Sequence, residues 1–195
     1  MLASHLDVQM HIAASDALAT LSRNVSENQM AAAEAGGIPP LVALLQSRHI
    51  DCQRNTSCAL AMLAEDDENK MQILKAGGIG PLVGLLSSGN DATQQYAALA
   101  LESLARDIPE IQATLHNEAA SKPLTVLLGS ESAETQESAM SALLCMAAHP
   151  DSRVIVVKRL VGVLLGRNTA AQLKASEALA VLSSRNSLNR QTIVQ

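Results

Sequence analysis

The chain has 195 residues, 48% of them apolar, and it lacks phenylalanine and tryptophan, so Tyr96 is the single member of the Phe, Trp and Tyr group. This composition supplies core for closely packed helices and argues against a β-sandwich or an enzyme core rich in aromatic residues. The formal net charge of −5 at pH 7 disfavours nucleic acid as a partner, because proteins that bind phosphate backbones carry a basic surface.

One segment recurs along the chain. Residues 35–45 read AGGIPPLVALL, and residues 76–86 read AGGIGPLVGLL, which gives a period of 41 residues. A degraded third copy begins at Ala119, and a fourth keeps only residues 161–165. Periods in this range are typical of stacked repeat architectures.

Each copy predicts the end of one helix and the start of the next. Ala-Gly-Gly suits a helix C-terminus, because glycine adopts a left-handed backbone conformation at little cost. Pro39, Pro40 and Pro81 follow, and proline is tolerated in the first turn of a helix, where its missing N–H would have no partner.

A longer third helix is predicted after a polar turn in each repeat. It carries a small residue, Ala-Leu three residues on, and an apolar residue three further, a spacing that places them on one helix face. No three-helix unit could bury that face alone, so neighbouring units must stack. The copies are Ala14/Ala17-Leu18/Leu21, Thr56/Ala59-Leu60/Leu63, Ala97/Ala100-Leu101/Leu104, Ala139/Ala142-Leu143/Met146 and Ala175/Ala178-Leu179/Leu182.

The repeats divide the chain into a single predicted domain, residues 1–195. Its units are a partial repeat (1–24), three full repeats (25–66, 67–107 and 108–149), a shortened repeat (150–185) and the start of another (186–195). In the shortened repeat the Ala-Gly-Gly linker is missing. There the first two helices fuse or the first is lost, and we expect an irregular junction near residues 154–159. Neither end resembles a polar cap, so we expect a fragment of a longer array.

The repeat resembles the armadillo repeat, whose pattern runs Ala-Gly-(Gly/Ala)-Ile-Pro-x-Leu-Val-x-Leu-Leu and then Ala-x-x-Ala-Leu-x-x-Leu. The match covers essentially the whole chain and is strongest in the units that end near Glu65 and Arg106. The resemblance implies an all-α fold, a right-handed α-solenoid of about four full three-helix repeats. It also implies a concave face lined by the third helices, on which partner proteins lie.

Candidate binding residues follow from helix geometry. If the Ala-Leu pairs face the core, the residue before each pair and the residue four later share the concave side. These pairs are Asp16/Thr20, Cys58/Met62, Leu99/Ser103, Ser141/Cys145 and Glu177/Val181. One turn earlier on the same stripe lie Asn55, Tyr96, Ser138 and Lys174. We expect extended partner segments to be held by side chains such as Arg54, Tyr96, Glu137 and Lys174.

The resemblance has limits at these positions. Nuclear-import armadillo proteins carry tryptophan and asparagine ladders here, and this chain does not, so binding of basic nuclear-localisation peptides is not carried over. The strongly basic groove of the adhesion-type catenins is also missing. Tyr96 is of a type enriched in interface hot spots, although burial in the core is a close alternative.

No cofactor, metal or catalytic site is predicted. His49, Cys52 and Cys58 lie near one another in sequence, but zinc needs a fuller ligand set. The acidic run at residues 65–68 is interpreted as a solvated turn before a helix N-terminus, where carboxylates are favourable. Each histidine is predicted at a turn or an exposed helix position, with nothing to bring two together, at His5, His11, His49, His116 and His149.

Cysteine spacing and apolar runs bear on the compartment. Cys58 and Cys145 fall two repeats apart, too far for a disulfide, so thiols are expected, as in a reducing compartment such as cytoplasm or nucleus. The most apolar run, residues 154–165, is too short to span a bilayer and contains Lys158 and Arg159. No membrane insertion is therefore expected.

Charge is distributed unevenly. Residues 1–149 carry 7 Lys and Arg against 17 Asp and Glu, whereas residues 150–195 carry 7 against 2. This asymmetry could orient an oppositely polarised partner. The alternative, which we favour, is that these are solvated residues, because charged side chains are ordinarily exposed.

The functional prediction is a protein-interaction scaffold or adaptor without catalytic activity. One alternative is the substrate-recruiting portion of a larger protein, since arrays resembling this one occur beside a U-box in ubiquitin ligases or on a vacuolar armadillo protein. An enzyme with a composite site would need clustered ionisable groups on the concave face, and that ladder is mostly neutral. A third alternative is a module that associates end to end through uncapped terminal repeats.

Overall fold

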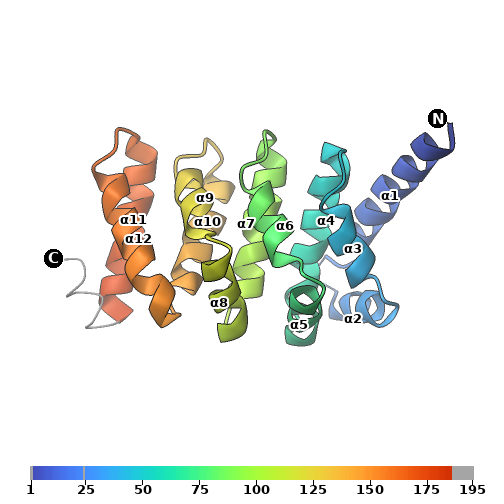
Figure 1. Ribbon diagram of the computed structural model, residues 1–195, viewed down its shortest axis with the longest axis horizontal. Coiled ribbons are helices and arrows are strands. Elements are labelled where there is room, and N and C mark those ends of the chain that lie inside the picture. The colour runs from blue at the N-terminus through green and yellow to red at the C-terminus, as the bar shows by residue number, and fades with distance from the viewer. Residues whose placement is uncertain (1, 24, 186–195) are drawn as a thin grey trace. The chain divides into compact units, whose positions relative to one another are not determined.

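The computed structural model describes the backbone of residues 2–23 and 25–185 and the side chains of residues 9–23 and 25–184. These residues form twelve α-helices and no strand (Figure 1). The contacts divide the chain into two compact units, Met1–Leu104 and Ala105–Gln195, with the boundary at the end of one long helix. Each unit is described separately below.

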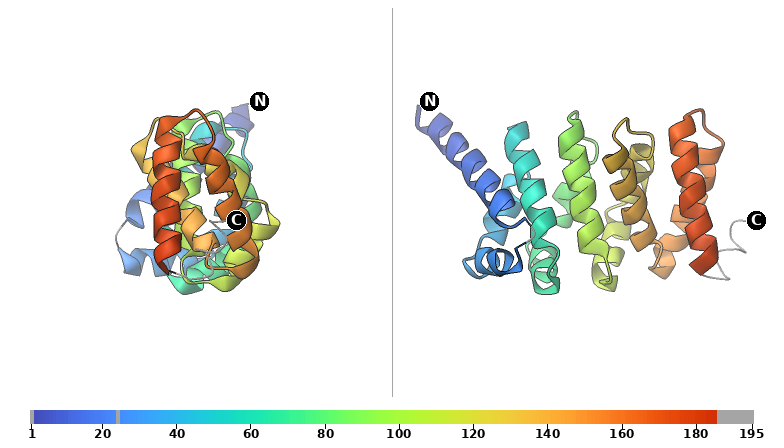
Figure 2. Two further views of the ribbon diagram at one scale, coloured as in Figure 1. Left: turned by 90° about the vertical axis from the view of Figure 1, so that its left-hand side faces the viewer. Right: turned by 180° about the vertical axis from the view of Figure 1, so that it is seen from behind.

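The N-terminal unit contains seven helices. The long helix α4 packs against α1, α2, α3 and α5 and so forms the centre of this unit. The right-hand view of Figure 2 shows α4 and α7 upright beside each other, with α1 inclined toward the base of α4. The helices are α1 (Leu2–Leu21), α2 (Ser26–Glu34), α3 (Ile38–Leu44), α4 (Ile50–Leu63), α5 (Asp67–Lys75), α6 (Ile79–Leu85) and α7 (Asp91–Ala105).

The C-terminal unit contains five helices. Its longest members, α11 and α12, pack against each other, while α10 packs against α8, α9, α11 and α12. None of the helices in the described part of either unit is long and apolar enough to cross a bilayer. The helices are α8 (Pro109–Asn117), α9 (Ser121–Leu127), α10 (Ala133–Met146), α11 (Pro150–Leu164) and α12 (Thr169–Arg185).

The Gly-Gly pairs end helices as predicted. Gly36 and Gly77 both adopt φ +75, the left-handed conformation that glycine enters without steric cost. The N–H of the following glycine then donates to the last turn of the helix, as Gly78 N does to the Ile73 carbonyl at 3.0 Å. In the degraded third copy Ala119 occupies the equivalent turn at φ 54, which is unfavourable for a residue with a Cβ atom.

The predicted core face is confirmed in four of the five copies. In these copies all four positions of the small-Ala-Leu-apolar pattern are buried. They are Thr56/Ala59-Leu60/Leu63, Ala97/Ala100-Leu101/Leu104, Ala139/Ala142-Leu143/Met146 and Ala175/Ala178-Leu179/Leu182. The prediction is wrong for the first copy, where Ala14 and Ala17 are exposed and Leu21 is 59% exposed. Helix α1 instead packs against α4 and buries Ser15, Ala19 and Ser22, because no described helix covers its other side.

The shortened repeat contains one long helix in place of two short ones. Helix α11 runs without interruption from Pro150 to Leu164, so the first two helices have fused, one of the two alternatives that the sequence left open. The irregular junction expected at residues 154–159 is wrong. Without the Ala-Gly-Gly linker, no residue there forces the backbone out of the helical conformation.

The acidic run at residues 65–68 lies at the junction of α4 and α5, between two repeats as predicted: it begins in the turn and ends with Asp67 and Glu68 in the first turn of α5. Asp66 caps α5 by accepting a hydrogen bond from the Asn69 N–H at 3.0 Å. Lys70 pairs with Asp67 at 2.7 Å across one helical turn. Glu65 accepts from the Gln29 side chain at 3.0 Å and thereby joins this turn to α2. These carboxylates therefore stabilise the junction between successive repeats.

Candidate functional site

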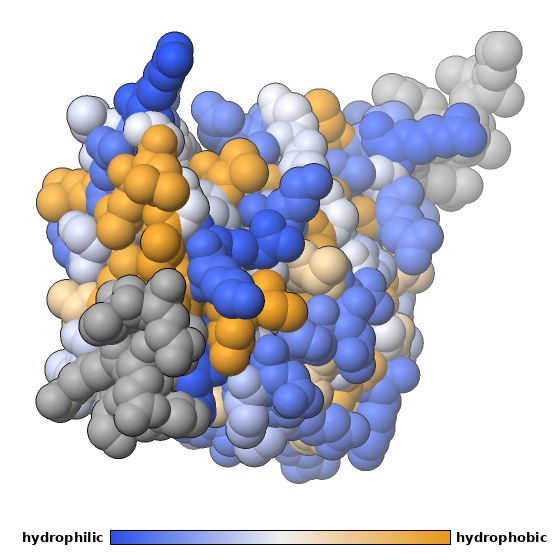
Figure 3. Space-filling model, turned by 60° about the vertical axis from the view of Figure 1, so that its left-hand side comes forward, coloured by the Kyte–Doolittle hydropathy of each residue, from blue (hydrophilic) through white to orange (hydrophobic). Residues whose placement is uncertain are grey.

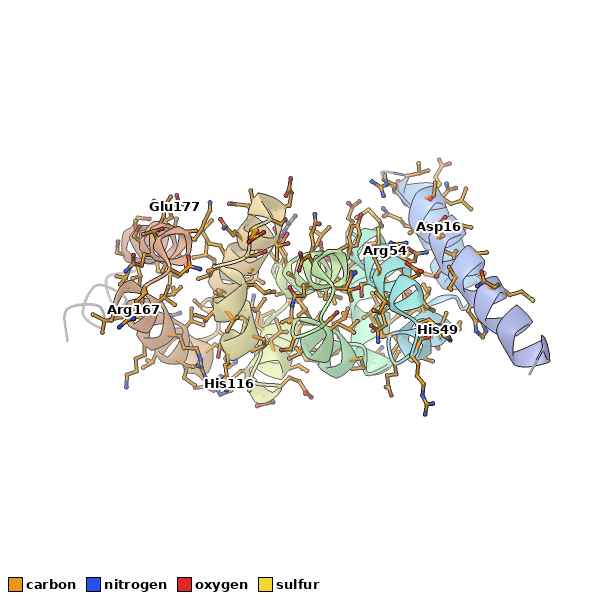
Figure 4. All side chains as sticks on the ribbon, turned by 90° about the horizontal axis from the view of Figure 1, so that it is seen from above. Asp16, His49, Arg54, His116, Arg167 and Glu177 are labelled. Atoms are coloured by element: carbon orange, nitrogen blue, oxygen red, sulfur yellow. The ribbon has the colours of Figure 1, made fainter. Side chains whose placement is uncertain are left out.

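A cleft of about 360 Å³ opens in the N-terminal unit between α1, α4 and α7. These are the third helices of three successive repeats, so the cleft runs along the direction in which the repeats stack. Figure 4 labels Asp16 on α1 and Arg54 on α4, which lie on neighbouring helices. The lining residues are Asp16, Ala19, Thr20, Arg23, Arg54, Asn55, Cys58, Ala92, Gln95 and Tyr96.

The cleft brings together several of the binding residues that the sequence predicts. Arg54, Asn55, Cys58 and Tyr96 all line it, together with the ladder pair Asp16 and Thr20. Helical spacing explains the agreement, because positions three and four residues apart share a face in each of the three helices. Their role in binding stays a prediction.

Four lining residues were missed by the sequence reasoning. Ala92 lies one turn before Tyr96, and Gln95 directly precedes it, so a wider stripe on the same helix would have included both. Ala19 is on the side of α1 that packs toward α4, which the repeat pattern assigned incorrectly. Arg23 follows the end of α1, and no periodic signal marks it.

Hydrogen bonds fix the side chains of α4 within the cleft. Asn55 donates from Nδ2 to the Ile12 carbonyl of α1 at 3.4 Å, and its Oδ1 accepts from Arg54 Nε at 3.2 Å. Arg54 also pairs with Asp51 at 3.3 Å. Arg54 remains half-buried, so its guanidinium is oriented by its neighbours while part of it faces the cleft.

Cys58 forms the buried floor of the cleft. Burial raises the pKa of its thiol, and the positive charge of Arg23 and a hydrogen bond with Tyr96 act in the opposite direction. A raised pKa leaves less of the reactive thiolate at neutral pH. This environment therefore favours a packed thiol that is hydrogen-bonded to Tyr96, and it disfavours a nucleophilic role for Cys58.

The remaining predicted residues of this unit lie outside the lining of the cleft. Met62 follows Cys58 by one turn on α4, and Leu99 and Ser103 follow Tyr96 on α7; all three are half-buried. None of the three is among the residues that line the cleft, and their part in binding stays a prediction.

In the C-terminal unit three predicted residues form an ion-pair cluster. Lys174 of α12 bridges Glu137 of α10 at 3.0 Å and Glu177 of its own helix at 2.9 Å. Hydrogen bonds to Glu177 and then to Glu137 raise the pKa of Lys174. The cluster links two third helices of successive repeats and presents both carboxylates to solvent.

The other ladder positions of this unit are less accessible. Ser138 is buried, and Ser141, Cys145 and Val181 are half-buried. All three cysteines of the chain lie in its described part, and none forms a disulfide there. The described residues contain no group of three or more His, Cys, Asp or Glu placed to hold a metal ion.

Two histidines converge, which the sequence reasoning excluded. The rings of His116 and His149 lie 6.5 Å apart between centroids, tilted by 38°, and both residues are half-buried. They meet because α8 packs against α11, and His149 directly precedes α11. Nδ1 of His149 is buried without a hydrogen-bond partner among the described residues. His11 and His49 are exposed as predicted; the side chain of His5 lies outside the described residues.

Comparisons with known proteins identify the repeat. A family model described as the Armadillo/beta-catenin-like repeat matches residues 26–64 and 66–106. An engineered protein of known crystal structure is 31% identical, with a TM-score of 0.79, over 94% of this chain and 77% of the other. The chain belongs to the armadillo-repeat family. The described residues form twelve helices and no strand, and this arrangement matches that of a designed armadillo repeat protein over 93% of the chain, which confirms the all-α armadillo-type fold that the sequence predicts.

Two designed armadillo proteins extend the comparison. Computationally designed armadillo repeat proteins for modular peptide recognition share 25% identity and a TM-score of 0.78, over 93% of this chain and 79% of theirs. A designed armadillo repeat protein in complex with the peptide (KR)4 has the same fold at 24% identity, with a TM-score of 0.78 over the same shares of the two chains. A search of curated protein sequences finds no significant match.

Proposed function

We propose that this armadillo chain is a non-catalytic scaffold that binds an extended segment of a partner protein across α1, α4 and α7. The observation that carries the proposal is the cleft between these three helices, which gathers side chains from successive repeats. Membership of the armadillo family and the peptide recognition named for designed armadillo proteins support this function.

The chemistry of the cleft suits an extended peptide, whose polar backbone groups and occasional apolar side chains can both find partners there. Arg54, Asn55 and Gln95 offer hydrogen-bond donors and acceptors to peptide groups, and Tyr96 offers a flat apolar face beside its hydroxyl. Asp16 faces the same space with the opposite charge to Arg23 and Arg54. This mixed charge distinguishes the expected ligand from a purely basic peptide.

The α10–α12 cluster is a second proposed contact region for the same class of ligand. Glu137 and Glu177 are already neutralised in part by Lys174, so a ligand there must compete with an existing ion pair. We therefore assign the principal affinity to the N-terminal cleft. The cysteines, none of which forms a disulfide, support the further proposal that the protein works in a reducing compartment, cytoplasm or nucleus.

The test is a selection of linear peptides from a displayed library by the full chain, followed by affinity measurements on the selected peptides. Tyr96→Ala should weaken binding by about tenfold, the scale of an interface hot spot, and Tyr96→Phe should retain most of it. Glu27→Ala, at an exposed position outside the cleft, serves as the control and should bind like the wild type.

Circular dichroism of each variant separates binding from folding. Loss of helicity in Tyr96→Ala in step with loss of binding would assign Tyr96 to the core. Selected peptides whose affinity ignores both Tyr96→Ala and Arg54→Ala would remove the cleft from the proposal.

A further inference from the structure

A second and larger concavity lies in the C-terminal unit. It is a groove of about 710 Å³ between α9 and α11 that extends to the first turn of α12. It uses the second helix of one repeat and the fused helix of the next, whereas the proposed cleft uses third helices only. The lining residues are Lys122, Thr125, Val126, Gly129, Ile155, Lys158, Arg159, Gly162, Val163, Gly166, Arg167, Asn168 and Ala171.

Positive charge reaches this groove from both walls. Lys122 comes from α9, Lys158 and Arg159 come from α11, and Arg167 follows the end of α11. No acidic side chain occurs among the described residues that line the groove. Lys122, Lys158 and Arg167 are exposed, and Arg159 is held in place by a hydrogen bond to Ser121 Oγ at 2.9 Å. The groove is therefore an uncompensated basic site.

Apolar side chains lie between these charges. Val126 is 71% exposed and Ile155 is 40% exposed, and the half-buried Val163 continues the apolar lining. Figure 3, which turns this unit toward the viewer, shows apolar groups set among strongly hydrophilic ones. A single exposed valine is ordinary, but apolar groups gathered within a concave and charged surface are typical of a binding site.

Gly162 places no side chain on the α11 side of the groove. A Cβ atom built on Gly162 meets nothing within 4 Å, so no packing constraint inside the protein requires glycine there. Glycine within a helix is destabilising by roughly 0.5–1 kcal/mol relative to alanine. Its presence at the lining of the groove is consistent with room kept for a ligand.

The groove is separate from the armadillo ladder of its own unit. Glu177 and Arg167 point to different sides of the α11–α12 pair (Figure 4). The ladder residues Glu137, Lys174 and Glu177 are absent from the described lining of the groove. A ligand in the groove would therefore leave the ladder free.

We propose that this groove binds a short acidic segment of a partner protein that also carries apolar side chains. Carboxylates of such a segment would pair with the cations on both walls, and its apolar residues would cover Val126 and Ile155. A protein segment is favoured over a lipid surface because the cations lie on two helices that line opposite sides of the groove, where one chain laid between α9 and α11 can pair with both sides. Nucleic acid is disfavoured because the groove lacks an aromatic side chain on which bases could stack.

The test uses the full chain and a labelled synthetic peptide in which leucines at helical spacing are embedded among glutamates. Fluorescence anisotropy should show binding that weakens as salt rises, because the contacts are partly exposed ion pairs. A peptide with serine for leucine and a peptide with lysine for glutamate should both bind at least about tenfold more weakly, since each removes one half of the recognition.

Variants of the groove locate the site. Lys158→Glu combined with Arg167→Glu should weaken binding by about tenfold or more, and Gly162→Glu should do the same by filling and recharging the wall. Arg48→Glu combined with Lys75→Glu, at two exposed positions of the N-terminal unit, changes the net charge by the same amount as the groove double variant and should bind normally. Gly162→Ala, which adds only a methyl group to open space, should bind within a few-fold of the wild type while raising helix stability.

Each remaining outcome overturns the proposal. Equal losses in the Arg48→Glu/Lys75→Glu control and in the groove double variant would show general charge attraction. Binding of the chain to phosphatidylserine-containing vesicles, with no peptide binding, would replace a protein ligand by a membrane. If Tyr96→Ala lost peptide binding while the groove variants bound fully, the acidic segment would bind in the N-terminal cleft. The groove proposal would then be wrong, and the proposed scaffold function would remain supported.

Discussion

The adjacent glycines Gly77 and Gly78 should respond differently to the same substitution, because each is required for a different reason. Gly77 has φ +75, and a Cβ atom there would meet nothing within 4 Å. Gly78 has an ordinary φ of −71, but its Cβ would lie 2.8 Å from Ile73 Cγ2 and 3.2 Å from Val42 Cγ2. The first position is limited by backbone conformation and the second by packing.

The magnitudes follow from these two causes. Gly77→Ala incurs the left-handed strain of about 1–2 kcal/mol, offset by the roughly 0.4–1 kcal/mol that alanine contributes by restricting the unfolded chain. The net loss is about 1 kcal/mol. Gly78→Ala forces a methyl group against Ile73, which is fully buried and cannot easily retreat. Overpacking of this kind destabilises by about 1–3 kcal/mol.

Asparagine substitutions distinguish backbone conformation from packing more clearly than alanine substitutions do. Asparagine tolerates the left-handed conformation, and Gly77 is exposed, so Gly77→Asn should recover most of the stability that Gly77→Ala loses. Gly78→Asn should be worse than Gly78→Ala, because the larger side chain meets the same buried neighbours. Urea unfolding followed by circular dichroism at 222 nm measures all four variants against the wild type.

The reasoning would be refuted by a reversed pattern. If asparagine rescued position 78 and not position 77, conformation and packing would have been assigned to the wrong residues. A neutral Gly78→Ala would show that Val42 and Ile73 can move apart, and the close approach of α3 and α5 would then contribute little to stability.

Other expected outcomes concern the core, a helix cap and an ion pair. Leu101→Ala, at a fully buried position, should lower the free energy of unfolding by about 2–5 kcal/mol; a change below about 0.5 kcal/mol in urea unfolding would mean that the repeat alignment is misplaced. Ser132→Ala should lose about 1 kcal/mol, because the Ser132 hydroxyl caps α10 by accepting from the Thr135 N–H at 3.1 Å; an unchanged melting temperature would contradict this. Hydrogen bonds to Glu177 and Glu137 raise the pKa of Lys174, so its contribution is complete below the usual lysine value of about 10.4 and is lost as pH rises through the folded pKa. The stability difference between wild type and Lys174→Met should therefore be constant near neutrality and shrink in strong alkali, and a difference that grows with pH would exclude the bridge.

Much of the local structure could be predicted because it depends on neighbours in sequence. Gly36 and Gly77 end helices through a backbone preference that belongs to glycine itself, and Pro81 lies in the first turn of α6 for an equally local reason. The stripe that contains Asn55, Cys58 and Tyr96 follows from the helical period. The same periodicity predicted that Ala14 and Ala17 lie in the core, and this was wrong. Periodicity shows which residues share a helix face, but it does not show which face a neighbouring helix covers.

Residues in contact across repeats could not be predicted in the same way. Lys174 meets Glu137 only because α10 and α12 pack at one particular distance and rotation, and a separation of 37 residues carries no such information. His116 and His149 converge for the same reason, through the packing of α8 on α11.

The sequence by itself determined the repeat, its period and the helix ends marked by glycine and proline, since glycine, proline and helical periodicity act through local backbone geometry. Tertiary structure alone decided the side of α1 that is buried and the two concavities lined by side chains from different repeats. Each depends on how whole helices fit against one another. Packing fixes distances between residues that are remote in sequence, and these distances determine which charges are paired and which remain available to a partner.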